Sequence, residues 1–158
     1  MKYLTLALGI FLSDSYIKNR VEKPFGKNVV VQEAREPEKE RNILYNKIKL
    51  RKHHNKGVAL NAFDKKQPVV AVVSSVLTAL LGGALFVAEK NRENHGYRLG
   101  LAFLLGGAMS NSWDRLKRHY VVDYFSVNTK CKKLKDIVFN ISDCFIMTGA
   151  LLTAFFRK

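Results

Sequence analysis

The chain has 158 residues, which fits a single domain, and its 27 Lys and Arg against 13 Asp and Glu give a net charge of +14. That balance favours an anionic partner, either nucleic acid or anionic lipid. The sequence holds no zinc-finger or RNP motif, and its basic residues flank apolar stretches, which argues against a nucleic-acid binder. Charged segments alternate with uncharged stretches that are too long for ordinary core helices.

Four apolar stretches predict membrane-spanning helices, at about residues 3–20, 68–88, 97–114 and 137–156. The second has twenty consecutive uncharged residues from Val69 to Ala88, which as a helix cover the ~30 Å of a hydrocarbon core. Pro68 stands just ahead of it, where a helix tolerates proline. We therefore expect an all-α integral membrane protein, a four-helix transmembrane bundle that forms one domain over residues 1–158.

The first stretch is marginal, because the fifteen residues from Tyr3 to Ile17 reach only ~23 Å as a helix. It becomes adequate when extended through Lys18 and Arg20, whose long side chains can snorkel toward the interface. A cleaved signal peptide is the alternative, since a basic residue before an apolar run fits that pattern. Asp14 falls where the apolar core of such a peptide should continue, which favours a retained span.

A polar insertion of about residues 21–66 separates the first two stretches. Within it, Asn28–Gln32 and Tyr45–Leu50 have strand character, the latter with alternating polar and apolar residues. Two glycine pairs in the apolar stretches, Gly82-Gly83 and Gly106-Gly107, predict close packing between helices.

An up-down-up-down arrangement of the four stretches brings the conspicuous polar residues toward one membrane face. They are Asp14, Asn55, Asn61, Asn111, Asp114, Arg115, Asp123, Asn140 and Asp143. Asp143 lies six residues into its stretch, ~9 Å along the helix, where a carboxylate costs a few kcal/mol and usually marks a function. A structural ion pair with Arg115 is the alternative for Asp143.

Asp123 is expected in the loop between the third and fourth stretches, within an apolar frame. Burial in such a frame raises the pKa of a carboxyl group. By itself Asp123 reads as an ordinary loop aspartate. If Asp123 and Asp143 share a site, one of them stays protonated near neutral pH, because two adjacent carboxylates cannot both ionise cheaply. Such a pair supplies a base to activate water and an acid for the leaving group, and hydrolyses an amide without metal or covalent intermediate.

Other chemistries fit the sequence less well. His53 and His54 are adjacent and lack a nearby carboxylate cluster, so they predict no site. Cys131 and Cys144 have no metal-ligand spacing, and we assign no disulfide. We expect neither a metal nor a cofactor.

Five short blocks, in order along nearly the whole chain, resemble the signal peptidase II (lipoprotein signal peptidase) family. They are residues 14–18 (DSYIK), 54–59 (HNKGVA), 106–115 (GGAMSNSWDR), 121–124 (VVDY) and 139–143 (FNISD). The resemblance implies an intramembrane aspartic endopeptidase with Asp123 and Asp143 as its catalytic pair. It implies substrate-binding or supporting roles for Asp14, Asn55, Asn111, Asp114, Arg115 and Asn140.

The substrate implied by the resemblance is a diacylglyceryl-modified prolipoprotein, cut just before its lipidated cysteine. The cyclic peptide globomycin is the expected inhibitor. The implied location is the bacterial plasma membrane, with several passes and with the polar insertion forming a small extracytoplasmic β structure over the site. The excess positive charge adds anionic lipid headgroups as expected partners, and nucleic acid is not expected.

The sequence departs from the family pattern in three places. Val58–Leu60 stands where the family usually has Ala-Ala-Phe, Ser142 stands where it has alanine, and the insertion is unusually basic. These changes indicate a divergent member, and a non-catalytic lipoprotein- or lipid-binding relative is the alternative. A small transporter or channel subunit is disfavoured, because the charges cluster near one face instead of lining a path across the bilayer.

The distribution of basic residues conflicts with the implied orientation. Of the 27, 21 lie on the side of the polar cluster, at positions 18–66 and 115–135. The positive-inside rule, read literally, would place that side in the cytoplasm. We follow the resemblance, which places it outside, because the substrate is presented at the outer leaflet.

Overall fold

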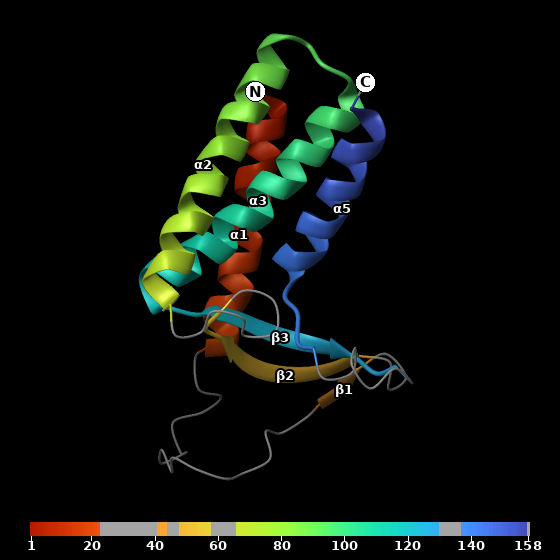
Figure 1. Ribbon diagram of the computed structural model, residues 1–158. Helices are drawn as coiled ribbons and strands as arrows, with labels where there is room; N and C mark the ends of the chain where they lie inside the picture. Colours follow the sequence, from red (N-terminus) through yellow and green to blue (C-terminus); the bar gives the residue numbers. More distant parts are fainter. Residues whose placement is uncertain (23–40, 44–47, 58–65, 130–136, 158) are drawn as a thin grey trace.

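The computed structural model describes residues 1–22, 41–43, 48–57, 66–129 and 137–157. Within this part of the chain, four helices stand side by side and a three-stranded sheet lies across one of their ends (Figure 1). The elements are α1 (Lys2–Glu22), β1 (Arg41–Ile43), β2 (Ile48–Asn55), α2 (Gln67–Lys90), α3 (His95–Arg118), β3 (Val121–Val127) and α5 (Ile141–Phe156). Both termini lie at the end of the helices away from the sheet.

Helix α3 is central and packs against α1, α2 and α5. Its glycines allow two of these contacts. A Cβ at Gly106 would lie 2.8 Å from the carbonyl oxygen of Ala7 in α1, and one at Gly107 would lie 2.6 Å from that of Ser142 in α5. The predicted close packing is confirmed for Gly106 and Gly107. The same prediction is wrong for Gly83, where an added Cβ would meet nothing within 4 Å.

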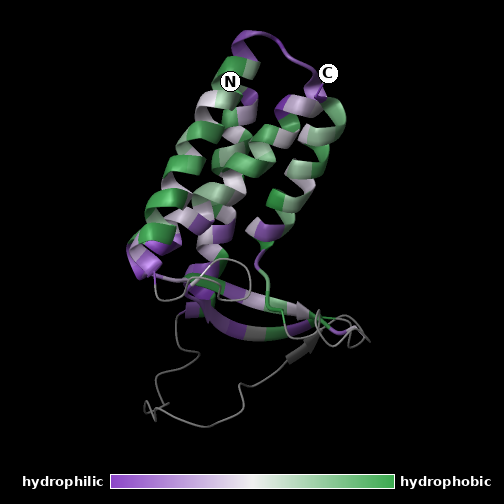
Figure 2. Cartoon of the chain, in the orientation of Figure 1, coloured by the Kyte–Doolittle hydropathy of each residue, from purple (hydrophilic) through white to green (hydrophobic). Residues whose placement is uncertain are grey.

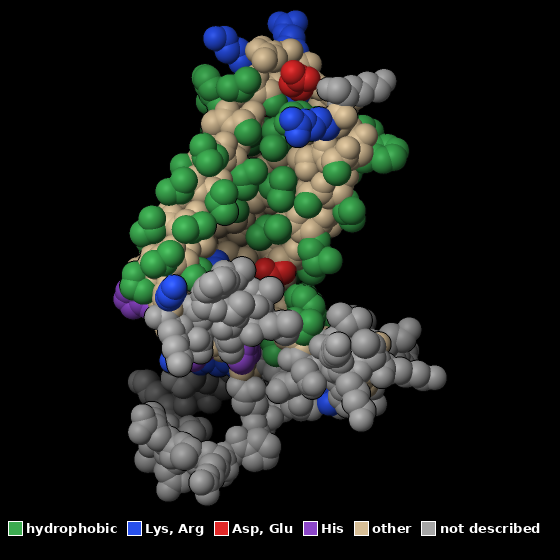
Figure 3. All heavy atoms as spheres, viewed as in Figure 1, with side chains coloured by type: hydrophobic (Ala, Val, Ile, Leu, Met, Phe, Trp, Pro, Cys, Tyr) green, Lys and Arg blue, Asp and Glu red, His purple; other side chains and the backbone are tan. Residues whose placement is uncertain are grey.

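The outer surface of the helices is apolar. Hydrophilic residues gather at the sheet end and at the α2–α3 connection, with hydrophobic residues between (Figure 2). Hydrophobic side chains cover the visible helices along their length, and Leu80, Phe86 and Leu151 expose 64%, 69% and 72% of their surface (Figure 3). So large an apolar exposure suits lipid and not water.

Among the described helices, α2 is long and apolar enough to cross a membrane by length and composition. Helix α5 is apolar but has 16 residues. It begins at Ile141, four residues later than the predicted span, because Asn140 caps it. Helix α3 is longer than the predicted span, since its polar last turn continues to Arg118.

The sheet differs from the prediction in its composition. Its order is β1-β2-β3, with both pairs antiparallel. Strand β2 overlaps the predicted strand at Tyr45–Leu50, whereas Asn28–Gln32 lies outside the described residues. The third strand comes from outside the insertion: Asp123, predicted in a loop, lies in β3 opposite His53 of β2. Its neighbours are β-branched and aromatic, which favours a strand despite the single carboxylate.

Candidate active site

A cavity of about 780 Å³ lies between the sheet and the adjoining ends of α2, α3 and α5. Among the helices it is bordered mainly by apolar side chains, Leu77, Leu81, Leu104, Ala108 and Ile146, together with the hydroxyls of Ser74, Thr78 and Ser112. Toward the sheet it is bordered by the polar residues His53, Asn55, Asn111, Arg115, Asp123 and Asp143, and also by Val121, Val138 and Phe139. The cavity therefore joins a hydrophobic half to a half with two carboxylates.

Asn140 connects these two carboxylates. Its side-chain oxygen accepts a hydrogen bond from the Asp143 backbone N–H, and its own backbone N–H donates to Asp143 Oδ2, each at 3.0 Å. This reciprocal capping box fixes Asp143 in the first turn of α5. The Asn140 amide nitrogen donates to Asp123 Oδ1 at 2.7 Å. One fully buried asparagine thus contacts both aspartates, from a position between a strand and a helix N-terminus.

Asn111 of α3 forms a second support. Its amide nitrogen donates to Asp143 Oδ1 at 3.0 Å. Its side-chain oxygen accepts from Asn140 Nδ2 at 3.2 Å and from Lys18 Nζ at 2.8 Å. Because Lys18 only donates, the oxygen of Asn111 must face it, and the amide must then face Asp143.

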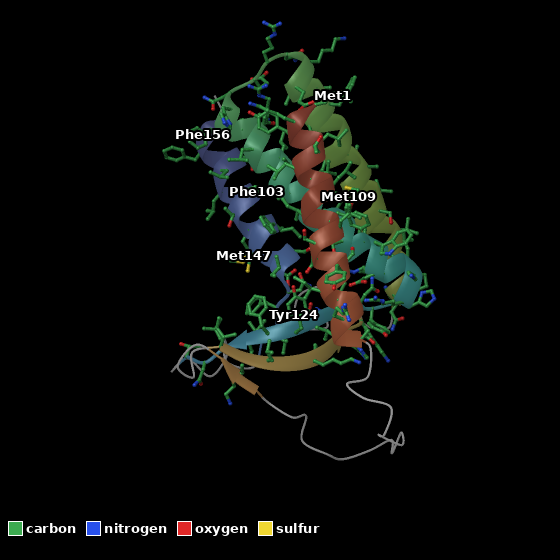
Figure 4. The ribbon with its side chains drawn as sticks, turned by 180° about the vertical axis from the view of Figure 1, so that it is seen from behind. Met1, Phe103, Met109, Tyr124, Met147 and Phe156 are labelled. Atoms are coloured by element: carbon green, nitrogen blue, oxygen red, sulfur yellow. The ribbon has the colours of Figure 1, made fainter. Side chains whose placement is uncertain are left out.

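Beneath this pair lies a charged group with no exposed side chain. Asp14 and Lys18, one turn apart on α1, are both 0% exposed, and Lys18 Nζ lies 2.9 Å from Asp14 Oδ2 and 3.1 Å from Asp114 Oδ2. Asp14 also accepts hydrogen bonds from Ser110 and from Tyr124, which lies where the sheet meets the helices (Figure 4). A buried ion pair is tolerated only when its remaining polar atoms are satisfied, and these are.

Ser142, the departure from the family alanine, belongs to the same group. It is fully buried directly before Asp143, and its hydroxyl donates to Asp14 Oδ2. The added oxygen therefore has a partner, and it joins the first turn of α5 to α1.

Asp114 and Arg115 act at the end of α3. Asp114 accepts from Arg118 Nη1 at 3.0 Å and from the Val122 backbone N–H at 3.3 Å, so it holds the start of β3. Arg115 donates to the carbonyl oxygens of Asn111 and Gly57, at 3.4 and 3.2 Å. The alternative considered for Asp143 was a structural ion pair with Arg115. Among the described residues these two side chains form no ion pair. The buried Nε of Arg115 lacks a hydrogen-bond partner there, and the side chain borders the cavity.

The electrostatics of the site are clearest at Asp123, which lies in the sheet. Burial, and next the negative charge of Asp143, raise the pKa of Asp123 to about 7. Hydrogen bonds from Asn140 and Asn55 oppose this increase only in part. The Asp123 carboxyl is consequently poised to exchange a proton near neutral pH.

The structure brings together eight residues singled out in the sequence: Asp14, Asn55, Asn111, Asp114, Arg115, Asp123, Asn140 and Asp143. Asn61 and Cys131 lie outside the described residues, and Cys144 is an exposed free thiol. In the described segments, no group of three or more His, Cys, Asp or Glu could hold a metal ion.

Two features were missed in the sequence. Lys18, expected to snorkel toward the interface, is instead fully buried and bridges α1 to Asn111, and its spacing of four residues from Asp14 was a usable signal. His53 borders the cavity, and its position two residues before Asn55 on a strand was the signal for that.

Comparison with known proteins agrees with this geometry. The lipoprotein signal peptidase of Caldicellulosiruptor bescii is 28% identical over 155 residues, covering 98% of this chain and 89% of that protein. The one of Mesorhizobium japonicum is 29% identical over 154 residues, covering 97% and 83%. A bacterial membrane enzyme solved by the in meso method at 2.3 Å has the same fold, with a TM-score of 0.73, 18% identity, and coverage of 98% of this chain and 85% of that one. The family described as signal peptidase (SPase) II matches residues 6–157. With nearly its whole length matched, this chain belongs to the signal peptidase II family.

Proposed function

We propose that this protein is an aspartic endopeptidase that cleaves diacylglyceryl-modified prolipoproteins immediately before the lipidated cysteine. Membership of the family supports a protease that processes lipoproteins. The observation that carries the aspartic mechanism is the contact of one buried residue, Asn140, with both Asp123 and Asp143 at the polar end of the cavity.

In the proposed reaction the pair shares one proton. The ionised carboxylate takes a proton from a water molecule as the water oxygen attacks the scissile carbonyl carbon. The protonated carboxyl gives its proton to the departing amide nitrogen, so the peptide bond is replaced by a carboxylic acid and an amine. We assign the proton at rest to Asp123, because its pKa is about 7. In this proposal Asn111 and Asn140 hold the pair, and Asn55 and Arg115, which border the cavity, bind the substrate backbone.

This assignment predicts the dependence of cleavage on pH. Below pH 7 Asp123 keeps its proton, and above it the pair carries two negative charges and no acid. We expect kcat/KM to fall as the pH rises through about 7, by about tenfold per unit well above it. Initial rates between pH 5.5 and 9 in one detergent would measure this. A rate that rises through pH 7 and stays high would show that the proton is not held by Asp123.

Cleavage itself is tested with the purified protein and a precursor that carries the diacylglyceryl group. Mass spectrometry should find a mature product that begins with the lipidated cysteine, and an unmodified precursor of the same sequence should remain intact. Tight binding of the lipidated precursor without any cleavage would instead establish the alternative, a non-catalytic lipoprotein-binding relative.

We further propose that the four helices all span the bacterial plasma membrane as one domain, with the sheet and the site at the extracytoplasmic surface. The apolar surface of the helices supports the membrane location. Anionic headgroups are the partners proposed for the basic charge, and globomycin is the proposed inhibitor. Reporter fusions at Arg41 and Asn94 should report the outside and the cytoplasm respectively, whereas a cytoplasmic Arg41 would reverse the orientation.

A further inference from the structure

The cavity has an apolar side and a polar side, and these set the direction in which the proposed substrate lies. Its apolar half lies among the helices and suits the hydrophobic signal peptide. Its polar side, which holds the two aspartates together with His53 and Asn55, lies against the sheet. With the scissile bond at Asp123 and Asp143, the residues that follow the lipidated cysteine must leave the cavity along the sheet.

His53 stands on that exit path. It pairs with Asp123 across β2 and β3, and residues opposed in this way share a face of a sheet. It also lies two residues before Asn55 in β2, so both side chains belong to the same face, and both border the cavity. His53 is exposed, and within the described segments its side chain forms no hydrogen bond or ion pair.

The adjacent His54 has the opposite role. Its Nε2 lies 2.7 Å from Glu22 Oε1 at the end of α1, and its ring stacks on Tyr120 at 4.1 Å between centroids. It does not border the cavity. The two neighbouring histidines therefore lie on opposite faces of β2 and have different contacts. His54 is consequently a matched control for His53.

Among the residues that the structure describes, one guanidinium borders the same cavity as His53. From α3, Arg115 faces the same cavity with its Nε lacking a partner in the described part of the chain. Two carboxylates border the same cavity, Asp123 opposite His53 in β3 and Asp143 in α5, and they accept hydrogen bonds from Asn140 and Asn111. A carboxylate in the departing segment would find a hydrogen-bond donor in His53 and a cation in Arg115.

We propose that His53 is a specificity-determining residue that contacts the first residues after the lipidated cysteine and favours an acidic side chain there. The inference rests on the proposed function, which supplies the substrate and its direction. His53 is not a member of the catalytic pair. The preference for an acidic residue and the cleavage by the pair are therefore tested by separate outcomes.

The test compares three lipidated precursors that differ only in the residue following the cysteine: Asp, Asn or Lys. They are cleaved by the wild type, His53→Gln, His53→Lys and His54→Gln, at one fixed pH and in an uncharged detergent, so that lipid headgroups play no part. The wild type should prefer the Asp precursor over the Asn precursor by about three- to fivefold in kcat/KM, the size expected for a partly exposed charge contact. The Lys precursor should be the slowest.

In His53→Gln the preference should fall toward one, mainly through KM, and in His53→Lys it should be kept or increased. His54→Gln should keep the wild-type preference. Thermal unfolding of each variant shows that the fold is retained. A wild-type preference that persists in His53→Gln, or an equal loss of preference in His54→Gln, would overturn the proposal. Cleavage that persists in Asp123→Asn would instead refute the proposed function, which is a separate outcome.

Discussion

Replacement of either Asp123 or Asp143 by asparagine is expected to lower kcat by about 10³-fold, since each variant removes one proton-transferring group from the pair. Asparagine has the same shape as aspartate, and its side-chain oxygen can still accept a hydrogen bond from Asn140. The contacts of Asn140 with positions 123 and 143 are therefore expected to remain. The proteins should fold, and KM for the lipidated precursor should change little. Single-turnover cleavage of that precursor, followed by gel shift or mass spectrometry, measures the effect.

The matched control is Glu93→Gln, an exposed carboxylate in the α2–α3 connection at the far end of the helices. It makes the same chemical change at a distance from the site and should cleave at the wild-type rate. If either Asp123→Asn or Asp143→Asn keeps more than about a tenth of that rate, the assignment of the pair is refuted.

The largest effect on stability is expected for Lys18→Met. The substitution preserves the length of the side chain but leaves Asp14 fully buried without a cation and removes the Lys18 contact to Asp114. Removing one partner of a buried ion pair costs about 3–5 kcal/mol, because the remaining charge is uncompensated. The donor that orients Asn111 is lost as well, so cleavage should also fall.

Thermal unfolding in detergent would measure this loss, with Lys90→Met, an exposed lysine at the end of α2, as the control that should unfold like the wild type. Asp14→Asn in the Lys18→Met background should recover part of the stability, because it removes the orphaned charge. An unchanged unfolding temperature in Lys18→Met would contradict a structural role for the buried pair.

Local signals in the sequence were sufficient for the helices. The uncharged run from Val69 to Ala88, with Pro68 just ahead of it, predicted α2. The small residues Gly106 and Gly107 predicted the close helix contacts of α3. Asp14 and Asp143 stood out because each interrupts an apolar run, where a charge needs a partner.

The strand that carries Asp123 could not be found in the same way. Strand β3 forms by pairing with β2, more than sixty residues earlier in the chain, and a single carboxylate in an apolar run reads locally as a loop. The role of Asn140 depends equally on distant contacts, since its amide reaches a strand while its oxygen caps a helix. His53 was dismissed for want of nearby carboxylates, which only the sheet register supplies.

The most direct test of the central claim, that Asp123 and Asp143 work as one unit, is the residual cleavage rate of the double variant Asp123→Asn/Asp143→Asn beside the two single variants. Groups that act together lose their whole contribution when either is removed. The double variant should therefore cleave as slowly as each single variant, and no slower. Losses that multiply in the double variant, or a single variant with near-normal activity, would contradict a shared catalytic pair.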